Sequence, residues 1–140
     1  MNTIFTQIKL MNKPYAQQMQ KLLEPFHVTE LQWGLLRYLY EINPATFSEV
    51  AAYWRVEKPS VTPVGQKLIE LGLVEVLTGT DKRQKVMHLT KTGQEKYFAC
   101  KEAVDAYQAQ LLHNISYDQL KVVQEVLDQI SSNMMKRGSL

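Results

Sequence analysis

A short basic loop between two apolar runs limits the folds open to this sequence. Residues 73–77 and 86–89 are rich in branched apolar side chains, and the segment 78–85 between them is polar and carries three cations. Two strand-like runs joined by a polar loop predict a β-hairpin. Because the loop is too long for a two-residue turn, we expect a basic tip that suits contact with a polyanion.

The hairpin follows a segment that is expected to be helical, residues 57–71. Gly72 would end this helix, because glycine readily adopts the left-handed conformation that is common at helix C-termini. A helix followed by a hairpin with a basic tip is the order of elements in a winged helix-turn-helix. The sequence therefore suggests DNA as the polyanion.

Apolar periodicity and capping residues predict five further helices. Residues 3–24 carry apolar side chains at steps of three and four, and Pro14 is expected to bend this helix. A Ser or Thr followed three residues later by Glu or Gln predicts helix starts at Thr29, Thr46, Thr92 and Ser116. The expected fold is mainly α with a small β-wing: four helices, two strands and two long helices.

The composition fits one globular domain. The chain has 140 residues, of which 45% are hydrophobic and 21% charged, with a formal net charge of +2. Its single cysteine, Cys100, excludes an internal disulfide and a cysteine-based zinc cluster, and we interpret it as a packed apolar residue rather than a redox sensor. No signal peptide and no membrane-spanning run is visible, so we expect a cytoplasmic protein.

The predicted helix at 57–71 has a leading end suited to the major groove, where base edges present distinct donors, acceptors and methyl groups. Small and polar side chains there let the backbone approach the bases. The candidate contacts are Ser60, Thr62 and Gln66 for hydrogen bonds to bases or phosphates, Val61 and Pro63 for a thymine methyl, and Lys58 and Lys67 for phosphates.

The loop also concentrates positive charge. Over residues 81–91 four cations and one carboxylate, Asp81, leave a charge of +3, which exceeds the total for the whole chain. Arg83 suits a narrow minor groove, and Asp81 is positioned to hold its guanidinium in one orientation. Lys82 and Lys85 are expected to neutralise phosphates. A charge run alone is more often a solvated loop, but the preceding helix favours DNA.

Two segments resemble the MarR family of bacterial transcription regulators. Residues 56–74 resemble its recognition helix and the start of the strand that follows. The wing signature of the family, Asp-x-Arg followed by an apolar strand and Leu-Thr-x-x-Gly, is matched by Asp81, Arg83, Leu89, Thr90 and Gly93. The resemblance covers nearly all of residues 1–140.

This resemblance implies a winged helix-turn-helix lobe at 30–92 and a homodimer built from the terminal helices, 1–28 and 93–140. The extensive apolar faces of the terminal helices favour packing on a second copy of the chain, and the alternative is that both ends cover one core within a monomer. The resemblance further implies a recognition helix in the major groove, a wing arginine in the minor groove, and phosphate contacts from Thr46 and Ser48. The expected function is a DNA-binding transcription regulator, most simply a repressor on a pseudo-palindromic operator.

The family also implies a small apolar or phenolic ligand between the dimer helices and the DNA-binding lobe. The candidate lining residues are aromatic: Tyr15, Trp33, Tyr38, Trp54 and Tyr107. Aromatic residues at helical spacing are also common in cores. Pro63 and Gly65 depart from the usual pattern of the family, and Pro63 is expected to kink the recognition helix.

Two other classes of function are weighed against a regulator. An enzyme is disfavoured because His27, His88 and His113 are far apart, and the sequence has neither a phosphate-binding loop nor a nucleophile motif. No cofactor and no metal are expected. A winged-helix module that binds protein and has lost DNA binding is the alternative, although Arg83 and the loop lysines are present.

Overall fold

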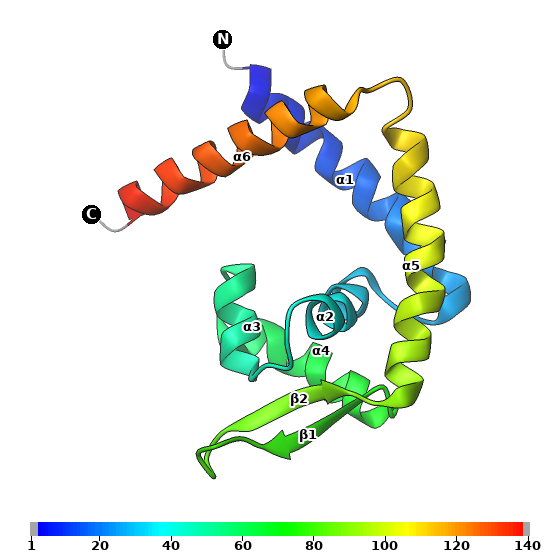
Figure 1. The fold of residues 1–140 in the computed structure, drawn as a ribbon, viewed down its shortest axis with the longest axis vertical. Coiled ribbons are helices and arrows are strands. Elements are labelled where there is room, and N and C mark those ends of the chain that lie inside the picture. The colour runs from blue at the N-terminus through cyan, green and yellow to red at the C-terminus, as the bar shows by residue number, and fades with distance from the viewer. Residues whose placement is uncertain (1–2, 139–140) are drawn as a thin grey trace. The chain divides into compact units, whose positions relative to one another are not determined.

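The structure is a computed structural model that describes residues 3–138, with side chains described for 3–136. These residues form six α-helices, one 3-10 turn and one β-hairpin, so the predicted fold class is confirmed (Figure 1). The elements are α1 (Thr3–Leu23), η1 (Glu24–Phe26), α2 (Glu30–Glu41), α3 (Phe47–Trp54), α4 (Lys58–Glu70), β1 (Val74–Thr78), β2 (Lys85–Leu89), α5 (Lys91–Leu111) and α6 (Tyr117–Gly138).

The chain divides into two units, Met1–Asp105 and Ala106–Leu140. The first unit holds α1 to α4, the hairpin and most of α5, and the second holds the end of α5 and α6. No described helix is long and apolar enough to span a lipid bilayer.

Side-chain caps begin the helices largely where the sequence predicts. At Thr29 and Thr46 the hydroxyl accepts the amide N–H of Gln32 or Glu49, and the side chain of that residue accepts the threonine N–H, all at 3.0–3.1 Å. Ser116 and Gln119 form the same pair of bonds before α6. These three capping boxes are confirmed.

The start predicted at Thr92 is wrong. Helix α5 begins at Lys91, and Thr90 caps it by accepting the Gly93 N–H at 3.0 Å. The Thr90 hydroxyl also donates to the carbonyl oxygen of Gly72 at 2.7 Å. A contact between distant parts of the chain therefore fixes where this helix starts.

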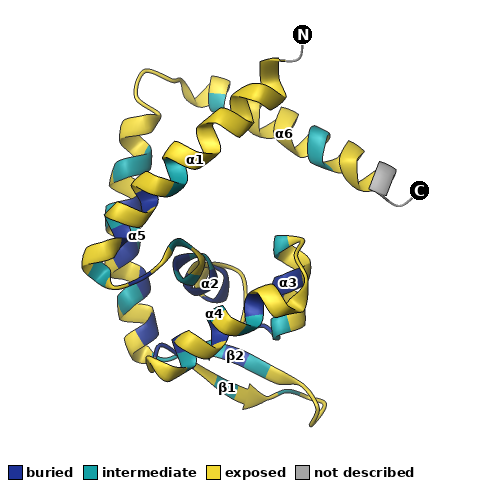
Figure 2. Cartoon of the chain, turned by 180° about the vertical axis from the view of Figure 1, so that it is seen from behind, coloured by how far each residue is buried: buried dark blue, intermediate teal, exposed yellow. Residues whose placement is uncertain are grey.

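The core of the first unit is centred on α2, which packs against α1, α4 and β2. Figure 2 shows buried residues on α2 and on the helices around it. Leu35 and Leu36 of α2 are fully buried together with Val50, Leu68 and Met87. Every buried side chain among the described residues is apolar or aromatic, with Cys100 among them. Burial of such side chains is the main stabilising contribution to the lobe.

The hairpin is antiparallel and is tied to the helices by a third short segment. Its register runs from Val74 opposite Leu89 to Thr78 opposite Lys85. Ala45, between α2 and α3, forms a bridge to Met87, with N–H···O distances of 3.2 and 2.8 Å. This bridge, which was not predicted from the sequence, holds the start of α3 beside β2.

Glycine permits a turn and two close contacts around α4. Gly72 ends the helix with φ of 73°, as predicted. A Cβ on Gly93 would lie 1.9 Å from the carbonyl oxygen of Leu73, and a Cβ on Gly65 would lie 2.2 Å from the ring of Phe47. Helix α4 continues through Pro63, so this proline does not end it.

Candidate nucleic-acid interface

The starts of α3 and α4 and the tip of the hairpin border one hollow of about 350 Å³. The lining residues are Thr46, Phe47, Ser48, Lys58, Arg83, Gln84 and Lys85. Five of them were predicted from the sequence as DNA contacts, and Phe47 and Gln84 were not. The lining holds three cations and no carboxylate, so it is strongly attractive to a phosphate group.

The first turn of α3 adds backbone donors to this hollow. Its capping box satisfies the amides of Thr46 and Glu49. The first-turn amides of Phe47 and Ser48 lie between them and have no acceptor within the helix, as is general for helix starts. Together with the exposed Ser48 side chain, they form a typical binding site for phosphate oxygens.

The tip of the wing is organised by Asp81, but not in the predicted way. Its carboxylate accepts the backbone N–H of Arg83 at 3.0 Å, and its carbonyl oxygen accepts the N–H of Gln84 at 2.9 Å. Asp81 forms no ion pair with the guanidinium of Arg83 in the described part of the chain. The prediction that Asp81 orients the guanidinium is therefore wrong: it fixes the turn on which Arg83 stands.

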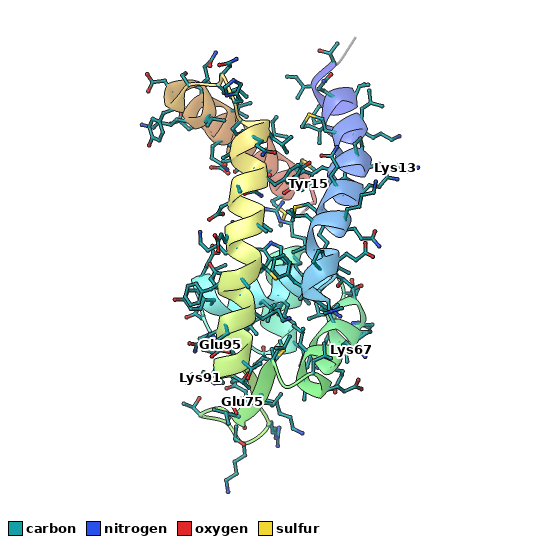
Figure 3. The ribbon with its side chains drawn as sticks, turned by 90° about the vertical axis from the view of Figure 1, so that its right-hand side faces the viewer. Lys13, Tyr15, Lys67, Glu75, Lys91 and Glu95 are labelled. Carbon is teal, nitrogen blue, oxygen red and sulfur yellow. The ribbon has the colours of Figure 1, made fainter. Side chains whose placement is uncertain are left out.

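The outer face of α4 carries most of the predicted groove contacts. Ser60, Pro63, Gln66 and Lys67 are exposed there. Lys67 is labelled in Figure 3, and its Nζ lies 3.8 Å from Oε2 of Glu70 on the same helix.

Two other residues of α4 differ from the prediction. The thymine contact assigned to Val61 is wrong, because its side chain is fully buried. Val61, Gly65 and Leu68 are all buried, and their steps of four and three are the signal that identifies the inner face of the helix. The hydroxyl of Thr62 donates to the carbonyl oxygen of Lys58 at 3.1 Å, so only its acceptor capacity remains for DNA.

Phe47 positions the hollow by packing α3 against α4. Its ring covers Gly65, where any larger residue would meet it. A glycine inside a predicted helix and an aromatic residue next to a capping threonine are the sequence signals of this contact. The contact cannot be predicted from either signal alone, because neither Phe47 nor Gly65 indicates which residue it packs against.

A second hollow, which we call the aromatic groove, lies between α2 and α3 and has a volume of about 370 Å³. It is lined by Gly34, Arg37, Tyr38, Glu41, Ile42, Tyr53 and Trp54. Two of the predicted ligand residues, Tyr38 and Trp54, are brought together here. The rings of Tyr38 and Tyr53 meet edge to face with centroids 5.0 Å apart.

The other predicted ligand residues lie elsewhere. Trp33 does not line the aromatic groove: it is buried and stacks on Tyr97 with ring centroids 5.5 Å apart. Tyr15 borders a separate hollow along α1 (Figure 3). Tyr107 lies in the second unit.

Glu41 connects the aromatic groove to α5. Its Oε1 lies 3.4 Å from Nε of Arg37, and its Oε2 accepts the hydroxyl of Tyr97 at 2.5 Å. Burial, and then the bond to Glu41, raise the pKa of Tyr97 far above its ordinary value, so this phenol stays protonated and acts as a donor.

Cys100, also on α5, is fully buried. Burial raises the pKa of its thiol, which disfavours the thiolate that a redox sensor needs.

Comparison with known proteins agrees with the fold. A model of the MarR family matches residues 28–84. An uncharacterized HTH-type transcriptional regulator of Staphylococcus aureus is 32% identical over 129 residues, which cover 90% of this chain and 88% of the relative. The HTH-type transcriptional regulator YwoH of Bacillus subtilis is 40% identical over 82 residues, and the match spans 59% of this chain and 60% of YwoH.

Solved structures extend the likeness to nearly all of the chain. Staphylococcus aureus MarR in complex with salicylate and kanamycin is 30% identical, with a TM-score of 0.84 over 96% of this chain and 91% of that one. The Staphylococcus aureus MepR–DNA complex has a TM-score of 0.83 over 94% of this chain and 96% of that one, at 20% identity, and shows the shared fold.

The winged helix-turn-helix and its basic hollow define the class of DNA-binding transcription regulators. Within that class, the chain belongs to the MarR family. The described residues hold no group of three or more His, Cys, Asp or Glu side chains that could bind a metal ion.

Proposed function

We propose that this protein is a repressor that binds a pseudo-palindromic operator as a homodimer in the cytoplasm. The observation that carries the proposal is the hollow in which Lys58, Arg83 and Lys85 meet the N-terminus of α3. Such a site holds the DNA backbone on either side of a groove while the adjacent helix reads base edges. The protein blocks transcription by occupying the site.

Each face of the lobe has its own role in this proposal. The exposed side chains of α4 lie in the major groove, where Ser60, Pro63 and Gln66 contact bases. Arg83 enters the flanking minor groove. The phosphate contacts come from Thr46, Ser48, Lys58, Lys67, Lys82 and Lys85.

The dimer in this proposal forms through the terminal helices, residues 1–28 and 93–140. Apolar side chains that are large and exposed occur along α1 and, separately, along α6. They include Ile4, Phe5, Ile8 and Met11 of α1, and Val122, Val126 and Met134 of α6. Exposed apolar surface of this extent is typical of a face that another protein surface covers.

A Lys82→Ala variant should weaken DNA binding equally on specific and scrambled sequences and lower the slope of log affinity against log salt by about 1. Lys82 is exposed at the wing tip, where it contributes charge rather than base contacts. The measurement is fluorescence anisotropy with duplexes from the region upstream of the coding sequence, across a salt series. Lys21→Ala, which removes an exposed lysine from α1, is the matched control and should leave the slope unchanged.

Failure of the wild-type protein to bind any DNA duplex at low salt would contradict the proposal that it is a repressor. It would favour the alternative, a winged-helix module that binds another protein.

A second proposal concerns release from DNA: a small phenolic ligand binds in the aromatic groove. Three aromatic rings and Ile42 form its apolar lining, and Arg37 supplies a cation. The Staphylococcus aureus MarR that is 30% identical to this chain was solved with salicylate, a ligand of suitable size and chemistry. Small-molecule sites commonly combine aromatic walls with polar groups that fix the orientation of the ligand.

Tyr53→Ala should weaken salicylate binding about three- to tenfold, the loss expected for one aromatic contact. Tyr53 is 61% exposed, so removal of its ring leaves the core intact. Isothermal titration calorimetry measures the affinity, and Tyr117→Ala, which truncates an exposed tyrosine of α6, is the control. Equal affinity in Tyr53→Ala and the wild type would place the ligand outside the groove.

A further inference from the structure

Glu41 is the last residue of α2 and has two partners on different sides. Toward the aromatic groove it meets Arg37, and toward the core it accepts the hydroxyl of Tyr97 on α5. A carboxylate at a helix C-terminus is unfavourable because the end of the helix is itself partly negative. Glu41 therefore depends on these two donors to hold its charge.

The two bonds of Glu41 differ in strength. Arg37 reaches it through Nε at 3.4 Å, and the side chains of Arg37 and Glu41 are 55% and 37% exposed. The bond from Tyr97 is short, 2.5 Å, and Tyr97 is 1% exposed and fixed between the rings of Trp33 and Tyr40. Glu41 is thus anchored to α5 and only loosely paired with Arg37.

A ligand carboxylate in the groove can bind the guanidinium of Arg37 through two parallel hydrogen bonds, which is the stronger geometry. It would compete directly with Glu41 for Arg37. The displaced Glu41 would then repel the ligand's charge and be held by Tyr97 alone.

We propose that Glu41 couples the aromatic groove to α5: an anionic ligand takes Arg37 from Glu41, and the Glu41 carboxylate then depends on the hydrogen bond that the Tyr97 hydroxyl donates to it. The proposal rests on the ligand binding proposed above and names the residue through which occupancy is transmitted. Coupling of this kind is reciprocal, so a change at Tyr97 must alter ligand affinity in the groove.

This exchange predicts effects of opposite sign from two substitutions. Glu41→Gln removes the competitor's charge and should tighten salicylate binding about three- to tenfold. Tyr97→Phe leaves Arg37 as the remaining partner of Glu41 and should weaken salicylate binding by about the same factor. In the Glu41→Gln background, Tyr97→Phe should have no further effect on affinity.

The experiment is a double-mutant cycle on the full chain, with salicylate as the probe and calorimetry as the measurement. Glu95→Gln, which removes an exposed carboxylate from α5, is the control for charge (Figure 3). Tyr40→Phe, which removes the hydroxyl of the ring stacked on Tyr97, is the control for ring chemistry. Both controls should bind salicylate as the wild type does.

Four results would overturn the coupling. A purely structural role for the pair would make Glu41→Gln and Tyr97→Phe weaken binding alike. Independent effects that add in the double variant would show that no exchange occurs. If both variants bind salicylate as tightly as the wild type does, the coupling is contradicted but the proposed ligand site is not. If the wild-type protein binds no salicylate, both proposals are contradicted. If Glu41→Gln does not fold, the salicylate affinities of Tyr97→Phe and Tyr40→Phe still test the proposal. Equal affinities of these two variants would contradict the coupling.

Discussion

Replacing Gly93 with alanine should lower the free energy of unfolding by about 3 kcal/mol, the upper part of the range for overpacking a closed site. The new Cβ would lie 1.9 Å from the carbonyl oxygen of Leu73. That oxygen cannot easily move away, because it accepts the N–H of Thr90 at 3.1 Å. The substitution therefore forces the start of α5 away from the residue before β1.

Urea denaturation followed by circular dichroism measures this loss. The matched control is Gly72→Ala, where an added Cβ would meet nothing within 4 Å and the only cost is the positive φ of 73°. That cost is about 1–2 kcal/mol. A loss at Gly93 no larger than the loss at Gly72 would show that the backbone relaxes around the methyl group.

Replacing Arg83 with alanine should weaken operator binding by about 1–3 kcal/mol, as for other groove contacts. Arg83 stands on a turn held by Asp81 and borders the hollow with Lys58 and Lys85. If it enters the minor groove, the loss should be larger on sites with A·T-rich flanks, because a narrow minor groove has the more negative potential. Anisotropy titrations with two duplexes that differ only in their flanks measure both effects.

Arg83→Lys is the control that separates charge from shape. It keeps the cation, so the salt dependence should stay at its wild-type value, but it loses the planar guanidinium and the preference for A·T-rich flanks. Unchanged binding of Arg83→Ala at physiological salt would show that the wing does not contact DNA.

The helices could be predicted from sequence where their signals are local. The capping boxes at Thr29, Thr46 and Ser116 need only residues three positions apart. The start of α5 could not be predicted in this way, because the Thr90 hydroxyl bonds to Gly72, eighteen residues earlier. The bridge from Ala45 to Met87 is likewise a contact between distant parts of the chain and leaves no mark in the sequence around either residue.

In the candidate DNA interface, too, local features could be predicted from the sequence and contacts between elements could not. Clustering of Lys82, Arg83 and Lys85 in one polar loop is visible in the sequence and predicts an exposed basic tip. Val61 was predicted to contact a thymine methyl group, whereas its spacing from Gly65 and Leu68 places it on the buried face of α4. Asp81 was assigned to the guanidinium, but the nearer backbone amide of Arg83 forms the bond.

The contact between Phe47 and Gly65 has a consequence for how binding preferences change during evolution. Because α4 lacks a side chain at this point, α3 lies directly on it, and the proposed phosphate contacts keep a constant offset from the base-facing surface. Exchanges at Ser60, Pro63 or Gln66, which are exposed, leave that offset unaltered. Single substitutions on this face can therefore change which operator sequence is preferred, while the proposed contacts with the sugar–phosphate backbone are kept.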